Sequence, residues 1–232
     1  MCGRYTLARS QQELSERFGI KQLFVDLDPR YNIAPTQKVP IILNVDGERT
    51  VQLFQWGLIP SWVKDLKGAK PLINARSETL AEKPSFKNSL VKRRCLVPAD
   101  GFYEWKKIGT ARRPMYIHRA DNVLFAMAGI YDEWKNEEGK SLRTFSIITT
   151  DANGTMSPVH DRMPAILSPE DEALWLNPEI KNPAELMPLL KPCPNDLITM
   201  HEVSPRVNTV AEDSPELIEA SGTQMRLDLF NL

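Results

Sequence analysis

The sequence contains few of the residues that form disulfides or bind metals, with three cysteines and three histidines among 232 residues. The cysteines, at positions 2, 95 and 193, are odd in number and widely spaced, which is typical of a reducing compartment rather than of a disulfide framework. The histidines are also far apart, and none has a second ligand at the short spacing that zinc sites use. We therefore expect neither disulfides nor a bound metal.

Long apolar segments are absent too. No run approaches the roughly 20 residues that a transmembrane helix needs, and the N-terminus lacks the basic and then apolar layout of a signal peptide. There is no Gly-x-Gly-x-x-Gly or phosphate-loop pattern and no Gly-x-Ser-x-Gly elbow, so nothing would anchor a nucleotide cofactor or present a hydrolase serine. These absences predict a cytoplasmic protein without a cofactor and without membrane association.

Charge of one sign is not in excess, since 29 basic and 30 acidic residues give a net charge of −1. This balance argues against a protein that coats nucleic acid by bulk charge, but it leaves room for a local basic groove. Basic residues do cluster at 92–95 and 111–114, although such runs usually form a solvated surface.

The spacing of β-rich runs indicates the fold class. Residues 38–58 are predicted to form a hairpin that turns at Asp46-Gly47, and more short β-rich runs follow between residues 94 and 203. Regular alternation of strands and helices is absent. We expect a single α+β domain over residues 1–220, with a curved, mostly antiparallel sheet that forms a pseudo-barrel flanked by short helices. Residues 221–232 would form a separate C-terminal tail.

The few predicted helices have recognisable starts. Ser10 and Glu13 form a capping box for a helix that follows. Ser168 and Asn182 are each followed by a proline at the first helical position, which indicates two further helices. Pro188 is expected to cut the last of these short.

Polar or strained residues stand inside several otherwise structural stretches. Taken singly, each has an ordinary interpretation: Asn74 as a turn cap, Glu104 on an exposed strand face, and His160 as a satisfied loop histidine. The stretches are MCGRYTL (1–7), RYNIAPTQ (30–37), WGLIPSW (56–62), NARSET (74–79), PADGFYEW (98–105), VHDRMP (159–164) and VSPRVN (203–208). In this order they resemble the signature blocks of the SOS-response-associated peptidase (SRAP) family, whose members sense abasic sites and cross-link to them in single-stranded DNA.

The resemblance implies that Cys2 becomes the N-terminal nucleophile once Met1 is removed. A free α-amine has a pKa near 7.7–8.0, so a useful fraction is neutral at physiological pH and can attack the aldehyde of an abasic sugar. The neighbouring thiol can then add to the Schiff base and close a thiazolidine, helped by its proximity. The alternative is that Met1 is retained and Cys2 is a small buried residue.

The resemblance also assigns three supporting residues. Asn74 would orient the sugar or the Cys2 amine, and Glu104 would exchange protons during ring opening and imine formation. His160 would be a second proton donor or acceptor, acting on the sugar ring oxygen. The division of roles between Glu104 and His160 stays open, and one of them would govern reversal of the cross-link.

Further residues are predicted to bind the DNA strand. Phosphate contacts are expected from arginines close to the proposed catalytic groups, with Asn32 as a polar helper. Two tryptophans could stack on bases beside the lesion, or they could belong to the core. The predicted set is Arg4, Asn32, Trp62, Arg76, Trp105 and Arg162, whereas Trp56, Trp134 and Trp175 are expected in the core.

The C-terminal tail carries a separate motif. The pentamer 226–230 resembles the short sequence by which bacterial proteins dock on the replication sliding clamp, with Leu227, Leu229 and Phe230 as apolar anchors. Arginine stands where that motif usually has glutamine. The alternative is that these side chains fold onto the protein's own core.

Three functions therefore compete. The first is a monomeric protein that binds abasic single-stranded DNA covalently and shields it near the nucleoid after damage, with lyase-type Schiff base chemistry. The second is an N-terminal-nucleophile peptidase or amidohydrolase, a hydrolase activity to which the family's name refers. The third is a single-stranded DNA-binding module without catalysis.

Overall fold

The computed structural model describes residues 2–22 and 27–222. Strands dominate, and the helices are short. The strands are β1 (Arg4–Leu7), β2 (Arg30–Ile33), β3 (Lys38–Val45), β4 (Glu48–Trp56), β5 (Asn74–Arg76), β6 (Arg94–Ala99), β7 (Gly101–Ile108), β8 (Ala111–Arg119), β9 (Phe125–Lys135), β10 (Ser141–Asp151), β11 (Arg162–Pro164), β12 (Ile166–Leu167) and β13 (Ile198–Glu202). The α-helices are α1 (Gln11–Phe18), α2 (Lys87–Lys92), α3 (Pro169–Leu176) and α4 (Pro183–Leu186).

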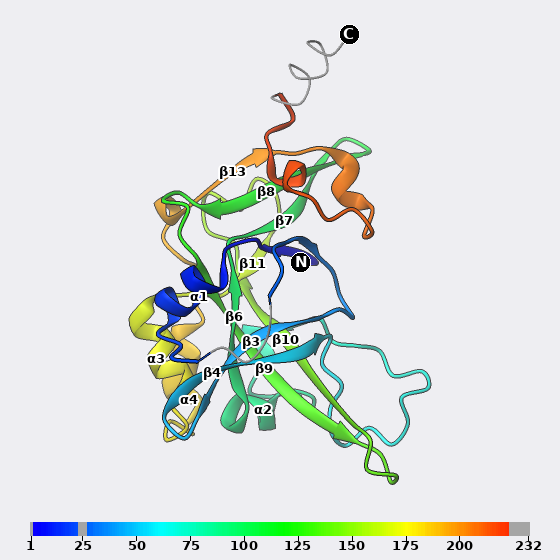
Figure 1. The fold of residues 1–232 in the computed structure, drawn as a ribbon, viewed down its shortest axis with the longest axis vertical. Helices are drawn as coiled ribbons and strands as arrows, with labels where there is room; N and C mark the ends of the chain where they lie inside the picture. Colours follow the sequence, from blue (N-terminus) through cyan, green and yellow to red (C-terminus); the bar gives the residue numbers. More distant parts are fainter. Residues whose placement is uncertain (1, 23–26, 223–232) are drawn as a thin grey trace.

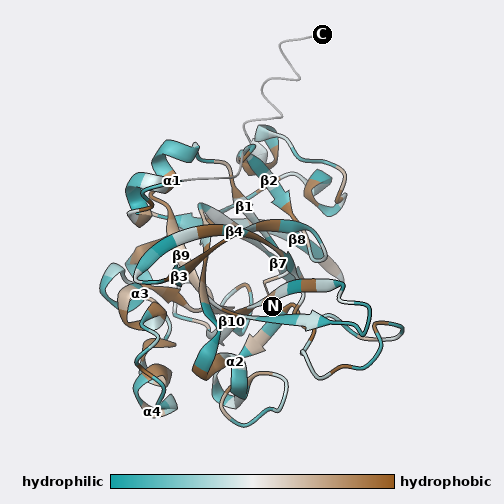
Figure 2. Ribbon diagram, turned by 60° about the horizontal axis from the view of Figure 1, so that its bottom comes forward, coloured by the Kyte–Doolittle hydropathy of each residue, from teal (hydrophilic) through white to brown (hydrophobic). Residues whose placement is uncertain are grey.

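The larger sheet closes on itself. Its strands run in the order β10-β4-β3-β6-β9, and β9 pairs again with β10, which completes a ring. Most pairings are antiparallel, but β4 and β5 both run parallel to β10. Figure 2 shows the strands curving around this ring, with short helices outside it. The predicted pseudo-barrel is confirmed.

A second sheet lies at one end of this barrel, in the upper half of Figure 1, with strand order β13-β8-β7-β1-β2. The chain passes from the barrel into this sheet at Asp100, the single residue between β6 and β7. It returns after β8 through residues 120–124 to begin β9. Because the two sheets exchange strands in this way, they form one α+β domain, as the sequence predicted.

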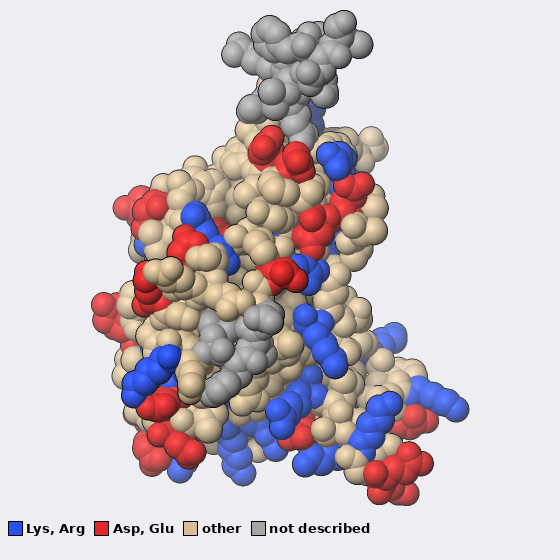
Figure 3. All heavy atoms as spheres, viewed as in Figure 1, with Lys and Arg blue, Asp and Glu red and all other residues tan. Residues whose placement is uncertain are grey.

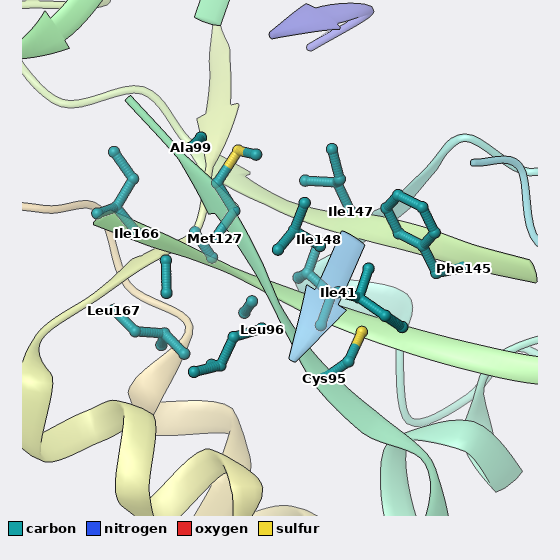
Figure 4. Packing of buried hydrophobic residues seen from close by; sticks show 14 of the residues in the cluster. Ile41, Cys95, Leu96, Ala99, Met127, Phe145, Ile147, Ile148, Ile166 and Leu167 are labelled. Carbon is teal, nitrogen blue, oxygen red and sulfur yellow. The ribbon is translucent and has the colours of Figure 1, made fainter. Parts of the chain in front are cut away.

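The barrel interior is filled by side chains rather than open. Figure 4 shows residues of β3, β6, β9 and β10 packing against one another, among them Ile41, Cys95, Met127 and Ile147, and all four are fully buried. Burial of this apolar surface is the main force that holds such a fold together. Trp56, Trp134 and Trp175 are buried as predicted, with exposed fractions of 0%, 5% and 0%. The prediction that these three tryptophans lie in the core is confirmed.

The predicted local signals are present. Ser10 and Glu13 form a complete capping box at α1. The hairpin between β3 and β4 turns at Asp46 and Gly47, which both have positive φ and thus fit the tight turn that matches strand twist. The side chains of Ser168 and Asn182 accept backbone hydrogen bonds at the starts of α3 and α4. Short-range sequence patterns therefore predicted these boundaries correctly.

Within the described ranges, none of the helices is both long and apolar enough to cross a bilayer. The anchors proposed for the sliding clamp, Leu227, Leu229 and Phe230, lie outside the described residues, so the tail boundary stays a prediction.

Candidate active site

Cys2 is placed by the pairing of β1 with β7. Arg4 lies opposite Tyr103 and Tyr5 opposite Phe102, so the antiparallel register carries the chain start back along β7 towards Glu104. Cys2 is fully buried within the main apolar cluster. Its thiol makes only a long contact of 3.8 Å with the carbonyl oxygen of Arg4. The thiol is therefore held mainly by packing and not by a strong hydrogen bond.

Glu104 supplies a carboxylate to the same region. Its side chain is only 4% exposed. Burial raises the pKa of the Cys2 thiol well above its usual range, and the negative charge of Glu104 raises it further. The thiol thus stays protonated at neutral pH, and the Glu104 carboxylate lies close enough to act on it electrostatically.

Asn74 joins the two sheets at this point. It begins β5, which is fixed by its parallel pairing with β10, opposite Ile147. The Asn74 Nδ2 donates a hydrogen bond of 2.8 Å to the carbonyl oxygen of Cys2. Its Oδ1 is buried and accepts no hydrogen bond from the described residues. Buried amide oxygens are rarely left in this state, so Oδ1 is available to accept a hydrogen bond.

His160 ends the turn before β11. The backbone N–H of Arg162 donates to His160 Nδ1 over 2.9 Å. Since an amide N–H can only donate, Nδ1 accepts this bond when it carries no proton and the neutral ring has its proton on Nε2. The carboxylate of Asp161 lies 2.8 Å from the same Nδ1 and would accept a hydrogen bond from it after protonation. Both protonation states of His160 therefore have a partner.

Two of the predicted DNA-binding residues are accessible. Arg76 ends β5, close to Asn74, and is exposed. Trp62 is 64% exposed and lies in the long loop after β4, together with the exposed Lys64 and Lys67. Figure 3 shows basic side chains down the right-hand part of the lower half of this face, the region into which that loop projects in Figure 1. This surface has the charge and the exposed ring that a nucleic-acid strand needs.

Three others are engaged inside the protein. Nη1 of Arg4 donates to Asn32 Oδ1 over 2.7 Å and to the carbonyl oxygen of Val207 over 2.9 Å. Asn32 is fully buried, and its Nδ2 also donates to backbone carbonyls of the C-terminal segment, including Val207. Trp105 donates its indole N–H to Asn208. These side chains hold the segment after β13 against the second sheet, and their contacts with DNA remain predictions.

Arg162 is surrounded by anions. Its guanidinium makes a bidentate ion pair with Glu78, with distances of 3.0 and 2.8 Å, and also contacts Asp151 at 2.9 Å. Burial by itself would raise the pKa of the Glu78 carboxyl, but the hydrogen bond from Arg162, a backbone hydrogen bond and the charges of Arg162 and Arg76 together lower it. Sequence reasoning missed Glu78, although it lies inside the NARSET block two residues after Arg76. The signal available in the sequence was an acidic residue two positions after a basic one.

The site therefore brings together Cys2, which lies two residues before β1, Asn74 of β5 and Glu104 of β7. On one side of β10, Arg76 of β5 pairs with Thr149. On the other side, β11, which begins at Arg162, pairs with residues 149–151.

Comparisons with known proteins identify the family. The family described as SOS response associated peptidase (SRAP) matches residues 1–210. The chain belongs to this family. It is 45% identical to the abasic site processing protein YoqW of Bacillus subtilis, over 95% of this chain and 100% of that protein. It is 37% identical to the abasic site processing protein HMCES of Gallus gallus, over 82% of this chain and 66% of that protein.

A solved structure shows the same fold. The crystal structure of a protein from Bacteroides thetaiotaomicron superposes with a TM-score of 0.86 at 35% identity, over 94% of this chain and 99% of that one. The SRAP blocks identified in the sequence thus lie within one domain whose fold is shared with that structure.

Proposed function

We propose that this SRAP protein recognises abasic sites in single-stranded DNA and forms a covalent thiazolidine cross-link through Cys2 after Met1 is removed. The observation that carries the proposal is the hydrogen bond from Asn74 to the Cys2 carbonyl beside the buried Glu104. The names of the relatives, abasic site processing proteins, indicate the class of DNA lesion.

The amine is the first nucleophile in this mechanism. The pKa of a free α-amine, near 8, is far below that of the buried Cys2 thiol, whose pKa is raised. The amine adds to the open-chain aldehyde of the abasic sugar, and loss of water gives a Schiff base. Asn74 fixes the backbone of Cys2 and thereby the direction from which the amine approaches.

The thiol completes the reaction. Its sulfur adds to the imine carbon, a C–S bond forms, and the thiol proton is transferred to the former imine nitrogen. The net reaction joins aldehyde and aminothiol with release of one water molecule and needs no oxidant. Because burial keeps the thiol protonated, ring closure needs a base, and Glu104, whose charge acts on the thiol, would accept the proton.

His160 is the proposed second acid–base group. Its Nδ1 has one partner for the neutral ring and another for the protonated ring, which suits a residue that gives and takes a proton on the sugar ring oxygen. Arg76 and Trp62 would hold the strand, by a phosphate contact and by stacking on a base. Arg162 would reach phosphate only by exchanging its carboxylate partners for it.

The test uses processed protein, with Met1 removed, and single-stranded DNA that carries one abasic site. We expect a shifted band on a denaturing gel that survives heating. Cys2→Ala should abolish it, and Cys2→Ser should leave an imine that appears only after borohydride reduction. Cys95→Ala is the matched control, because it removes a buried thiol of the barrel that takes no part in the reaction.

Replacing a supporting residue should slow the reaction rather than abolish it. Glu104→Gln should slow ring closure by about 10²-fold, the scale of general acid–base catalysis. Absence of any adduct from processed wild-type protein would contradict the proposal. Cleavage of peptides by the same preparation, lost in Cys2→Ala, would favour the peptidase alternative, and binding of intact strands without any adduct would favour a non-catalytic module.

We also propose further activities. The same groups could open the ring again and release the DNA, and their Schiff base resembles a lyase intermediate. The tail anchors Leu227, Leu229 and Phe230 would dock the protein on a sliding clamp at damaged forks. A peptide of residues 221–232 that fails to bind a purified clamp would refute this docking.

A further inference from the structure

A cavity lies on the face of the second sheet that is opposite to Glu104. In β7 and β8, Gly101 is opposite His118 and Tyr103 is opposite Tyr116, whereas Glu104 is opposite Met115. Neighbouring residues of a strand point to opposite faces, so Tyr116 and His118 lie on the face away from Glu104. The cavity has a volume of about 390 Å³ and is lined by Arg9, Tyr31, Asp100, Tyr116, His118 and His201 among others. We refer to it as the two-histidine pocket.

The wall of this pocket is a group of planar rings. The Tyr116 ring stacks on that of His118 with centroids 5.4 Å apart and an interplanar angle of 22°. His201 meets both rings edge-on, at 5.6 and 5.5 Å. Tyr116 can lie flat only because its neighbour is glycine, since a Cβ on Gly101 would come within 2.3 Å of the ring. The rings are therefore held in a fixed arrangement.

The hydrogen bonds of the two histidines fix their tautomers. His118 Nδ1 lies 2.9 Å from the carbonyl oxygen of Arg119, and His201 Nε2 lies 2.8 Å from that of Ile218. A carbonyl oxygen only accepts, so each of these nitrogens carries the proton of its neutral ring. The other nitrogens, His118 Nε2 and His201 Nδ1, are then acceptors, and no hydrogen bond from the described part of the chain occupies them.

A carboxylate adds a third acceptor. Tyr116 donates through its hydroxyl to Thr6, which donates to Asp100, and the backbone N–H of Ala8 donates to the other Asp100 oxygen at 2.7 Å. Each carboxylate oxygen has a second lone pair and can accept again. Burial raises the pKa of Asp100, and the positive charge of Arg9 lies close enough to oppose part of that rise.

We propose that the two-histidine pocket binds an unpaired nucleobase. Its aromatic wall suits a planar ring, its acceptors suit the amino and ring N–H donors of a base, and Arg9 suits the attached phosphate. Within the described residues no group of three or more His, Cys, Asp and Glu side chains could hold a metal ion, so the acceptors fit an organic donor better. Cytosine, adenine and guanine, which carry amino groups, should bind more tightly than thymine.

The base could come from a free nucleotide or from the DNA strand held by the proposed active site. Only the second source rests on the proposed function. In both cases the pocket would be a recognition site separate from Cys2, on the opposite face of β7.

The experiment follows the histidine side chains by nitrogen-15 NMR during titration with dCMP, dTMP and an unmodified oligonucleotide. We expect the signals of His118 and His201 to shift with dCMP at lower concentration than with dTMP, while His160 serves as an internal reference for free nucleotides. His118→Phe and His201→Phe keep a ring but remove an acceptor, and each should weaken dCMP binding about five- to tenfold, the worth of one hydrogen bond. Thr199→Val is the matched control, since Thr199 pairs with His118 but does not line the pocket.

Oligonucleotides distinguish the source of the base. If the signals of His118 and His201 shift at a lower concentration of oligonucleotide than of dCMP, the base comes from the DNA strand. If the order is reversed, the ligand is a free nucleotide. Cross-linking to abasic DNA is measured on the same samples. Shifts without cross-linking would overturn the proposed function and leave the pocket standing, whereas no shift of His118 or His201 with any ligand would overturn the pocket.

Discussion

Replacing Glu78 with glutamine tests whether Arg162 contacts DNA or only anchors the turn that carries His160. The change keeps the size of the side chain and one acceptor oxygen but removes the negative charge from a bidentate pair with Arg162. Two quantities should change in opposite directions, the stability of the fold and the affinity for single-stranded DNA.

The loss of stability can be bounded from exposure. The Arg162 side chain is 9% exposed and that of Glu78 is 49% exposed, so the pair lies between an exposed and a buried ion pair. Exposed pairs contribute about 0–1 kcal/mol, and breaking a buried pair costs about 3–5 kcal/mol. Solvent reaches one partner, and Asp151 and the Thr149 carbonyl still hold Arg162, so we expect a loss of about 1 kcal/mol. In a domain of this size that lowers Tm by roughly 2–4 °C.

The gain in affinity follows from charge. A phosphate on Arg162 would lie roughly 6 Å from the Glu78 carboxylate, where two unit charges in water repel by about 0.7 kcal/mol. Removing that repulsion should tighten binding about threefold at low salt, and by less as salt is raised. The assay is fluorescence anisotropy with an undamaged oligonucleotide at two salt concentrations.

Glu82→Gln is the control, because it removes the same charge from an exposed position close in sequence. If Glu78→Gln binds DNA no more tightly than Glu82→Gln, Arg162 does not contact phosphate. Its role would then be to hold the segment whose backbone N–H fixes the tautomer of His160.

The remaining predictions concern packing and pH. Gly129→Ala would place a Cβ 2.7 Å from the sulfur of Cys95, so we expect a loss of about 1–3 kcal/mol in urea unfolding, whereas Gly222→Ala meets nothing within 4 Å and should be neutral. Burial raises the pKa of the Cys2 and Cys95 thiols, so the folded state keeps protons that the unfolded chain loses above about pH 8.5. Stability should therefore fall as pH rises beyond that value, by up to about 1.4 kcal/mol per pH unit for each thiol. Cys95→Ala should make the midpoint of urea unfolding fall less steeply with pH. An unchanged slope would contradict the raised pKa of Cys95.

Predictions of the local structure succeeded where the signal is carried by adjacent residues. The capping box at Ser10, the turn at Asp46-Gly47 and the proline that cuts α4 short all depend on contacts within a few positions. The tryptophan assignments also held for the core, where the apolar pattern of the strands indicates burial.

Predictions of side-chain roles were less complete, and Arg4 shows why. Its position beside Cys2 suggested a phosphate contact, but its guanidinium bonds Asn32 and the carbonyl of Val207, which lies far away in the sequence. Nothing near Arg4 in the sequence specifies that partner. Glu78 was missed for a similar reason, since its pairing with Arg162 exists only because β5 and β11 both pair with β10.

The sequence by itself determined the family and the fold class, and it supplied the proposed nucleophile. A cysteine after the initiator methionine can offer an amine and a thiol on one residue, and this property is covalent and independent of folding. The tertiary structure decided everything that depends on distance: the amide of Asn74 on the Cys2 carbonyl, the charge of Glu104 beside the thiol, and the rings that enclose the two-histidine pocket. These features come from strand register and sheet closure, which bring together residues that no short stretch of the sequence connects.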